Sequence, residues 1–278
     1  MPTAPVYLHS MIYSTLAAVA IVYSAMVGLL YLGQRSLMYQ PTQDLGTPAS
    51  HGIPEASPVF LNTSGGLELQ SWYVPSVSDG AVILYFHGNA GHIGDRGSKV
   101  RPYVEAGYGV MLVGYRGYGG NPGSPTEEGL YEDAETALSS LKELGIEPKD
   151  WVLYGESLGS GVAVEMALRY AGAGTPVRAV VLEAPFTSMV DAAANHYPFV
   201  PARTLVKDSY DSLSKISKIS TNLLIFHGSL DRTVPFLHGQ NLFEAALEPK
   251  RFHRFEGAHH NDLYDFGAAR VAIDYLRF

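Results

Sequence analysis

Ser157 lies at the centre of the motif GESLG at residues 155–159, directly after the apolar run WVLY at residues 151–154. Glycines two positions before and after a serine are typical of a tight strand–turn–helix junction, because strand and helix pass close together there. A serine in such a turn becomes a nucleophile when a base removes its proton and an acid orients the base. The short motif also arises by chance, so this interpretation depends on finding those partners.

Asp231 is the strongest candidate for the acid. It follows the apolar run LLIF at residues 223–226, in the loop HGSLDRTVP, and it comes after the serine in the chain. In α/β-hydrolases the three residues follow strands in the order Ser, Asp or Glu, His. An aspartate at this position can instead cap the next helix. Glu183, after the next predicted strand, is the more serious rival, and Asp208 and Asp211 are further ones.

Two adjacent histidines near the C-terminus, His259 and His260, supply the candidate base in the segment FEGAHHNDL. Histidine suits the role because its ordinary pKa lies near neutrality, so it can accept a proton and return it. A metal site is an alternative, but neighbouring side chains point in different directions and no other ligand has a suitable spacing. A surface loop without a catalytic role is the other alternative.

Backbone N–H groups must stabilise the negative oxygen that forms when a serine attacks a carbonyl. Leu158, the residue after the nucleophile, is the expected first donor. The glycine-rich segment YFHGNAGHIGDRG at residues 85–97 provides Asn89 as the predicted second donor, with Ala90 as the alternative. The same segment resembles a phosphate-binding loop, but it lacks the Gly-Lys-Ser/Thr ending of such loops. The predicted chemistry requires no metal or cofactor.

These residues need a scaffold, and apolar runs alternate with helical segments from residue 59 onward. This alternation predicts an α/β fold of the α/β-hydrolase type, with a mostly parallel sheet and helices on both faces. An antiparallel pair of strands turning at residues 64–66 precedes the parallel part. The predicted strands are 59–62, 67–74, 81–86, 110–113, 151–154, 179–182, 223–226 and 253–255, and the predicted helices are 126–144, 158–170, 237–246 and 268–276.

The chain divides into an N-terminal membrane anchor (1–34), a linker rich in Pro, Gly, Ser and Thr (35–58) and the hydrolase domain (59–278). Residues 11–32 carry no charge and would reach about 33 Å as a helix, enough to cross a bilayer. A cleaved signal peptide is the alternative, but neither a basic first segment nor an A-x-A-like site is present. Within the domain, residues 186–220 break the alternation and are read as a small lid, or as one crossover helix with a long loop.

Composition excludes several classes of function. The 278 residues carry a formal charge of −8 without a cluster of Lys or Arg, which argues against nucleic-acid binding. No cysteine is present, so disulfides, thiolate metal sites and a cysteine nucleophile are excluded. Arg35 directly follows the anchor and favours a cytosolic domain, but one charge leaves the sidedness open.

Several motifs resemble the Bem46-like α/β-hydrolases, a family that includes abhydrolase domain-containing proteins 13 and 17. They are YFHGNAGHIGDR, YRGYGGNPGSPTEEGLYEDAE, GESLGSGVAVEMA, HGSLDRTVP and AHHND. The family pattern of histidine followed by Asn-Asp implies that His260 is the base and His259 its neighbour. Ser157 and Asp231 fall on the family's nucleophile and acid positions. The absence of cysteine departs from the type-17 group, whose members associate with membranes through palmitoylated cysteines, and is nearer to type 13.

The resemblance implies an ester or thioester hydrolase, with protein depalmitoylation reported for the type-17 branch. The predicted function is therefore a single-pass membrane serine hydrolase with Ser157, Asp231 and His260 as its triad. Its expected substrate is an acyl ester or thioester, including a lipidated protein. A serine peptidase, a lipid hydrolase and a non-catalytic membrane scaffold are the alternatives. The acyl chain, the leaving group and the oligomeric state stay open.

Overall fold

One eight-stranded sheet organises the computed structural model, which describes residues 4–77 and 80–277. Its strand order is β10-β9-β8-β7-β4-β6-β3-β2, and all neighbouring strands are parallel except β3, which is antiparallel to both β2 and β6. The strands of this sheet are β2 (Ser57–Asn62), β3 (Glu68–Val74), β4 (Val82–Phe86), β6 (Gly109–Leu112), β7 (Trp151–Glu156), β8 (Ala179–Glu183), β9 (Asn222–Gly228) and β10 (Lys250–Phe255).

The central strands are buried and mostly apolar because helices cover both of their faces. All five residues of β4, VILYF, are buried, as are all six of β7. The edge strand β2 is mostly exposed and forms a hairpin with β3, in which Thr63 and Leu67 pair across the turn. The predicted α/β fold, with its antiparallel pair ahead of a parallel sheet, is confirmed.

Helices form a layer on each face of the sheet. The buried residues of α2 and α9 belong to one apolar cluster, and those of α3, α4 and α8 belong to the other. Thr126 caps the first turn of α3, accepting from the Gly129 amide, and Gly145 with φ 79° follows the last turn. The bounds are α2 (Gly97–Glu105), α3 (Glu127–Glu143), α4 (Leu158–Gly172), α8 (Leu237–Ala245) and α9 (Ala268–Leu276).

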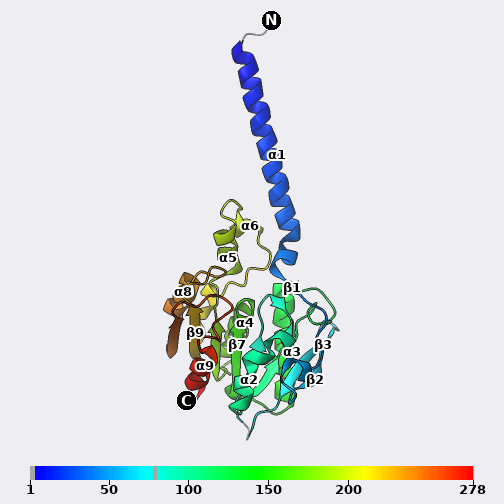
Figure 1. Cartoon of the computed structure of the whole chain (residues 1–278), viewed down its shortest axis with the longest axis vertical. Coiled ribbons are helices and arrows are strands. Elements are labelled where there is room, and N and C mark those ends of the chain that lie inside the picture. Colours follow the sequence, from blue (N-terminus) through cyan, green and yellow to red (C-terminus); the bar gives the residue numbers. More distant parts are fainter. Residues whose placement is uncertain (1–3, 78–79, 278) are drawn as a thin grey trace.

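The N-terminal helix α1 (Ala4–Met38) projects far beyond the sheet (Figure 1). Its side chains are exposed from residue 7 to residue 26, and residues Tyr7–Met38 are long and apolar enough to cross a membrane. The helix ends at Met38, four residues beyond the predicted end of the anchor, because Gln34 and Arg35 find partners in the domain. Residues 1–3 of the predicted anchor, 78–79 and 278 lie outside the described residues.

The predicted linker, residues 35–58, is packed against the domain instead of hanging free. Its first four residues continue α1, and Tyr39 and Ile53 are buried. The two-residue strand β1 (Gln40–Pro41) pairs in parallel with β5 (Ala90–Gly91), which was not predicted. Short 3-10 turns at Ala49–His51, Ile93–Arg96 and Pro148–Asp150 complete the connections. The exit of α1 is thereby joined to the glycine-rich loop after β4.

Residues 186–220 contain three short helices, α5 (Met189–His196), α6 (Ala202–Leu205) and α7 (Leu213–Ile216), and not one crossover helix. Figure 1 shows α5 and α6 beside the lower part of α1. We call residues 186–206 the cap segment. Its tip reaches far along α1, where the Tyr23 hydroxyl donates to the carbonyl of Phe199 over 2.8 Å.

Candidate active site

Ser157 occupies the sharp turn between β7 and α4. Its backbone dihedrals, φ 49° and ψ −111°, are strained for a residue with a side chain. The flanking glycines are required sterically, because a Cβ on Gly159 would lie 2.0 Å from the carbonyl oxygen of Phe86 and one on Gly155 would lie 2.5 Å from Cα of Ser160. The sequence therefore forms the predicted strand–turn–helix junction, which we call the nucleophile turn after the role predicted for Ser157.

Ser157, His260 and Asp231 form one continuous chain of polar contacts. Nε2 of His260 lies 2.9 Å from Oγ of Ser157, and Nδ1 of the same ring lies 2.6 Å from Oδ2 of Asp231. The other carboxylate oxygen of Asp231 accepts the amides of Thr233 and Val234, each at 2.9 Å. The three side chains come from loops after β7, β9 and β10, at the same edge of the sheet.

Neighbouring groups stabilise the ionised form of the Asp231 carboxyl. Burial alone would raise the pKa of this carboxyl, but hydrogen bonds from His227 and His260 outweigh it and keep the pKa below its ordinary value. Nε2 of His227 lies 3.1 Å from Oδ2 of Asp231. His227 was not singled out from the sequence, although it ends the same apolar strand that leads to Asp231.

The rival acids all have other partners. The Glu183 carboxylate contacts Lys99 and the Tyr154 hydroxyl, and Asp208 pairs with Arg35. Asp211 accepts the Ser214 amide at 3.2 Å. The ring of the neighbouring histidine, His259, lies against the Leu230 carbonyl at 3.1 Å. Among the described residues, Asp231 and His260 are thus the acid and base candidates that meet Ser157.

The two residues predicted to supply the backbone donors lie beside the serine. Asn89 and Leu158 line the same cavity as Ser157, whereas Ala90 does not. Within the ranges that the structure describes, neither amide has a protein acceptor. The Asn89 carbonyl accepts from the Gln40 amide at 2.9 Å and from the Tyr118 hydroxyl at 2.8 Å, so the loop is fixed with its N–H left available.

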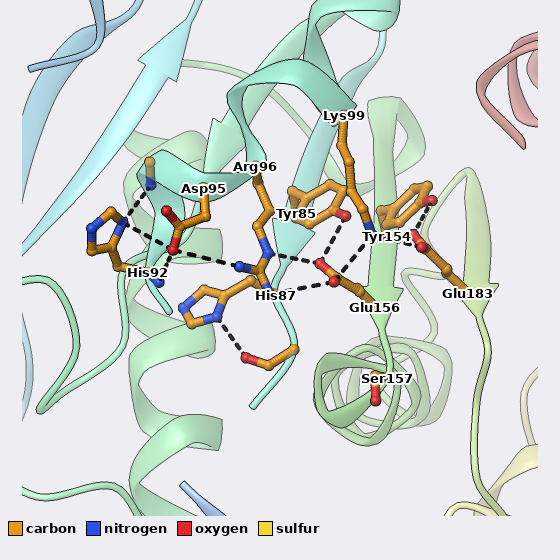
Figure 2. Close-up of polar contacts among 12 residues, drawn as sticks. Tyr85, His87, His92, Asp95, Arg96, Lys99, Tyr154, Glu156, Ser157 and Glu183 are labelled. Carbon is orange, nitrogen blue, oxygen red and sulfur yellow. Dashed lines mark hydrogen bonds and ion pairs between the residues drawn. The ribbon is translucent and has the colours of Figure 1, made fainter. Parts of the chain in front are cut away.

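A buried network of charges lies behind the nucleophile turn, and Figure 2 shows it between β7, β8 and the start of α2. Nζ of Lys99 lies 3.1 Å from Glu156 and 2.7 Å from Glu183, and Nε of Arg96 lies 2.9 Å from Glu156. Burial opposes ionisation of Glu156, but Arg96 and Lys99 outweigh it and hold its pKa well below the ordinary value. The tyrosines at 85 and 154 donate to the two carboxylates.

This network positions the turn because Glu156 directly precedes the serine in the chain. Sequence reasoning missed Glu156 and its two cationic partners. The available signal was a pair of carboxylates, Glu156 and Glu183, at the ends of two adjacent apolar strands. Buried carboxylates at such positions need cations nearby, and the charged segment after residue 94 supplies them.

A cavity of about 400 Å³ opens in front of Ser157. Its walls are mostly apolar and come mainly from the last turns of α1, the cap segment and the loop that carries Asp231, together with Asn89, Ser157 and Leu158. The α1 residues are Leu30, Tyr31, Gln34, Leu37 and Met38. The N-terminal helix therefore forms part of the site, which the sequence did not predict.

Comparisons with known proteins agree with this architecture. A family model described as "Serine aminopeptidase, S33" matches residues 78–205. "Uncharacterized protein Rv2307c" of Mycobacterium tuberculosis is 37% identical over 266 residues, covering 94% of this chain and 92% of that protein. "Alpha/beta hydrolase domain-containing protein 17B" of Homo sapiens is 36% identical over 190 residues, covering 66% of this chain and 62% of the relative.

Solved structures share the fold. An alpha-beta hydrolase from Vibrio vulnificus superposes with a TM-score of 0.70 at 23% identity, covering 89% of this chain and 91% of that one. The nucleophile turn on β7, the eight-stranded sheet and these sequence relatives agree with one another. The chain belongs to the Bem46-like family of α/β-hydrolases.

Proposed function

We propose that this protein is a serine hydrolase that cleaves carboxylic ester or thioester bonds. The observation that carries the proposal is the unbroken contact chain from Oγ of Ser157 through His260 to Asp231, at the edge of an apolar cavity. These are the contacts that activate a serine in acyl transfer.

In the first half of the reaction, Nε2 of His260 takes the Ser157 proton while Oγ attacks the acyl carbonyl carbon. The carbonyl oxygen becomes negative and is stabilised by the amides of Asn89 and Leu158. Asp231 stabilises the imidazolium. The tetrahedral intermediate then collapses, the bond to the leaving oxygen or sulfur breaks, and His260 returns its proton to that group.

In the second half, His260 deprotonates a water molecule, which attacks the acyl-enzyme. Collapse of the second intermediate releases the carboxylic acid and returns the proton to Oγ of Ser157. Every proton is accounted for by the triad and water, so no metal or cofactor enters the scheme.

A fluorophosphonate probe and a short p-nitrophenyl ester test the proposal together. We expect the full chain to be labelled and to hydrolyse the ester, and Ser157→Ala to lose both. Ser140→Ala is the matched control, because this serine bonds within α3 to the Ala137 carbonyl. A folded protein that is not labelled at Ser157 would instead support a non-catalytic scaffold.

Aminopeptidase activity is the second candidate, because it is the printed description of the matching family model. An aminopeptidase must bind a free α-ammonium group, for which a carboxylate is the usual partner. Among the described residues that line the cavity none is Asp or Glu. The cavity therefore favours an apolar acyl group, and a panel of acyl esters, thioesters and aminoacyl amides separates the two activities.

We also propose that α1 anchors the protein in a membrane, with residues 186–220 as a small lid and residues 59–278 as the hydrolase domain. The length and composition of α1 support the anchor. Arg35, at the domain end of the helix, favours a cytosolic domain. Resistance of the full chain to extraction from membranes at high pH, and protease access to the domain in oriented vesicles, test these two points.

A further inference from the structure

Resting on the proposed function, we infer that the substrate resides in the bilayer and carries a long acyl chain. We propose that this chain passes sideways from the lipid into the cavity, between α1 and the cap segment. The substrate class is a membrane-resident single-chain ester or thioester, and α1 is one wall of the acyl-binding site.

The composition of the cavity suits a long acyl chain. Leu30, Leu37 and Met38 of α1 line the same cavity as the cap segment and Ser157. Its volume of about 400 Å³ is that of a ligand pocket, and its walls offer few polar groups to a water-soluble substrate. An extended acyl chain is the ligand that such a space desolvates best.

Side-chain contacts hold α1 against the domain. Arg35 makes two contacts with Asp208, at 2.7 and 3.0 Å. Nε2 of Gln34 donates to the Leu205 carbonyl at 3.1 Å, and Oε1 of Gln34 accepts the Lys207 amide at 2.8 Å. The helix is therefore a fixed wall of the cavity and not a loose tether.

The end of α1 and the residues after it also contact Asn89, the predicted oxyanion donor in the glycine-rich segment after β4. The side-chain amide of Asn89 donates to the Met38 carbonyl at 3.0 Å, and the Gln40 amide donates back to the Asn89 carbonyl at 2.9 Å. Asn89, the predicted oxyanion donor, therefore contacts the end of α1, whose residues would bind the acyl chain of the substrate.

The length of α1 sets the depth of the cap segment relative to the bilayer. The span Tyr7–Met38 has 32 residues. Such a helix is about 48 Å long, whereas a hydrocarbon core is about 30 Å thick. If Tyr7 lies at the far surface of the hydrocarbon layer, about 20 residues of α1 cross that layer, and its remaining turns lie in the headgroup region on the side of the domain. The contact between Tyr23 and Phe199 then lies near the edge of the hydrocarbon layer.

The cap segment has the side chains that this position requires. Tyr197 and Phe199 are 39% and 53% exposed at its tip, and aromatic rings concentrate at the membrane interface. Arg203 in the cap segment and Lys207 just after it are both exposed, and cations near a membrane surface can meet anionic headgroups. The mouth between α1 and the cap segment is therefore placed at the border between the acyl chains and the headgroups.

Chain-length selectivity of the full-length protein in phosphatidylcholine vesicles tests the inference. The readout is the ratio of kcat/KM for p-nitrophenyl palmitate to that for p-nitrophenyl butyrate. Ala193 lines the cavity and Ala194, its neighbour on α5, does not. We expect Ala193→Trp to lower the ratio by about tenfold, as lost pocket contacts do, and Ala194→Trp to leave it in place.

A second pair of variants guards against misfolding of α5. Leu37 lines the cavity from α1, and Leu32, 77% exposed, does not. Leu37→Trp should lower the ratio and Leu32→Trp should not. An unchanged ratio in both cavity variants overturns the inference while the proposed function stands. Hydrolysis of both esters that survives in Ser157→Ala overturns the proposed function instead.

The depth of the cap segment is measured with brominated lipids, which quench tryptophan at the level of the acyl chains. Phe199→Trp should be quenched above the background of the buried Trp72 and Trp151. Leu144→Trp is the control, because Leu144 is 59% exposed just after the last turn of α3, whereas the first turn of that helix contacts Asp208. Equal quenching of the two variants contradicts lateral entry.

Discussion

The amide of Ser157 donates a hydrogen bond to the backbone carbonyl of Glu183 across 2.9 Å. This bond ties the nucleophile turn to the neighbouring strand β8, while the serine itself keeps a positive φ that costs about 1–3 kcal/mol in a residue with a Cβ. The strain is compensated by the surrounding structure, and it holds the hydroxyl above the end of the sheet.

Ser157→Gly should consequently be inactive yet more stable than Ser157→Ala. Glycine adopts a positive φ without a steric penalty, so we expect the free energy of unfolding to be about 1 kcal/mol higher after its greater chain entropy is counted. Urea denaturation of the two inactive variants measures the difference. If Ser157→Ala is the more stable one, the turn stores no strain.

Asp231→Asn should reduce kcat/KM for a short ester by about 10⁴-fold, because the amide no longer stabilises the correctly oriented imidazolium. Asp211→Asn is the control. It removes the charge from a rival that bonds the Ser214 amide and does not contact His260. Similar activities in the two variants would assign the acid elsewhere.

Gly159→Ala should destabilise the fold by about 3 kcal/mol or more, because its Cβ would lie 2.0 Å from the Phe86 carbonyl oxygen. Gly172 lies in the same helix and has no atom within 4 Å of a built Cβ. Gly172→Ala should therefore raise the free energy of unfolding, by up to about 1 kcal/mol. Chemical denaturation compares the pair, and a tolerated Gly159→Ala contradicts the close approach.

His87 should make the fold acid-sensitive. Complete burial, reinforced by Arg96, lowers the pKa of His87 to about 3. The unfolded chain therefore takes up a proton near pH 6.5 that the folded chain refuses, so this histidine's contribution to stability is lost as the pH falls from about 6.5 toward 3.

The slope expected from one such proton is about 1.4 kcal/mol per pH unit. His238 and His253 also have lowered pKa values and add slopes of the same sign. The test is the difference between the parent protein and His87→Gln between pH 6.5 and 4.5, where the variant should show the shallower slope. Parallel curves would mean that His87 is protonated in the folded state.

Lys99→Met should cost about 3–5 kcal/mol of stability, because it leaves the buried carboxylates of Glu156 and Glu183 without their shared cation. Lys149 pairs with Asp150 at the surface and is 78% exposed. Lys149→Met should change the free energy of unfolding by less than about 1 kcal/mol. Chemical denaturation at neutral pH measures the free energy of unfolding of both variants. Equal decreases would show that the buried network contributes no more to stability than a surface ion pair.

The sequence predicted most of the sheet and brought the right residues to its edge, because each chemical motif directly follows an apolar strand. Ser157, Asp231 and His260 were placed by that rule, and the structure brings them into contact. Their catalytic roles stay predictions. The predicted anchor ends at residue 34, whereas the helix α1 continues to Met38, and Arg35 within it pairs with Asp208.

Helix α2 was missed because Gly97 opens it and Pro102 lies inside it, and both residues usually mark loops. Arg96, just before this helix, and Lys99, in its first turn, could not be placed beside Glu156 without the helix. The role of α1 in the cavity was missed for a different reason. A helix that is apolar on all sides gives no signal for which face will contact protein.

Because α1 forms one wall of the cavity, a protein without this helix would differ from the full chain in its acyl-chain selectivity. A protein truncated so that it begins at Tyr39 would lack the wall of the cavity that α1 provides, and water would enter from that side. Acyl preferences recorded on that soluble fragment would belong to the fragment, and the native selectivity would be visible only with the first 38 residues in place.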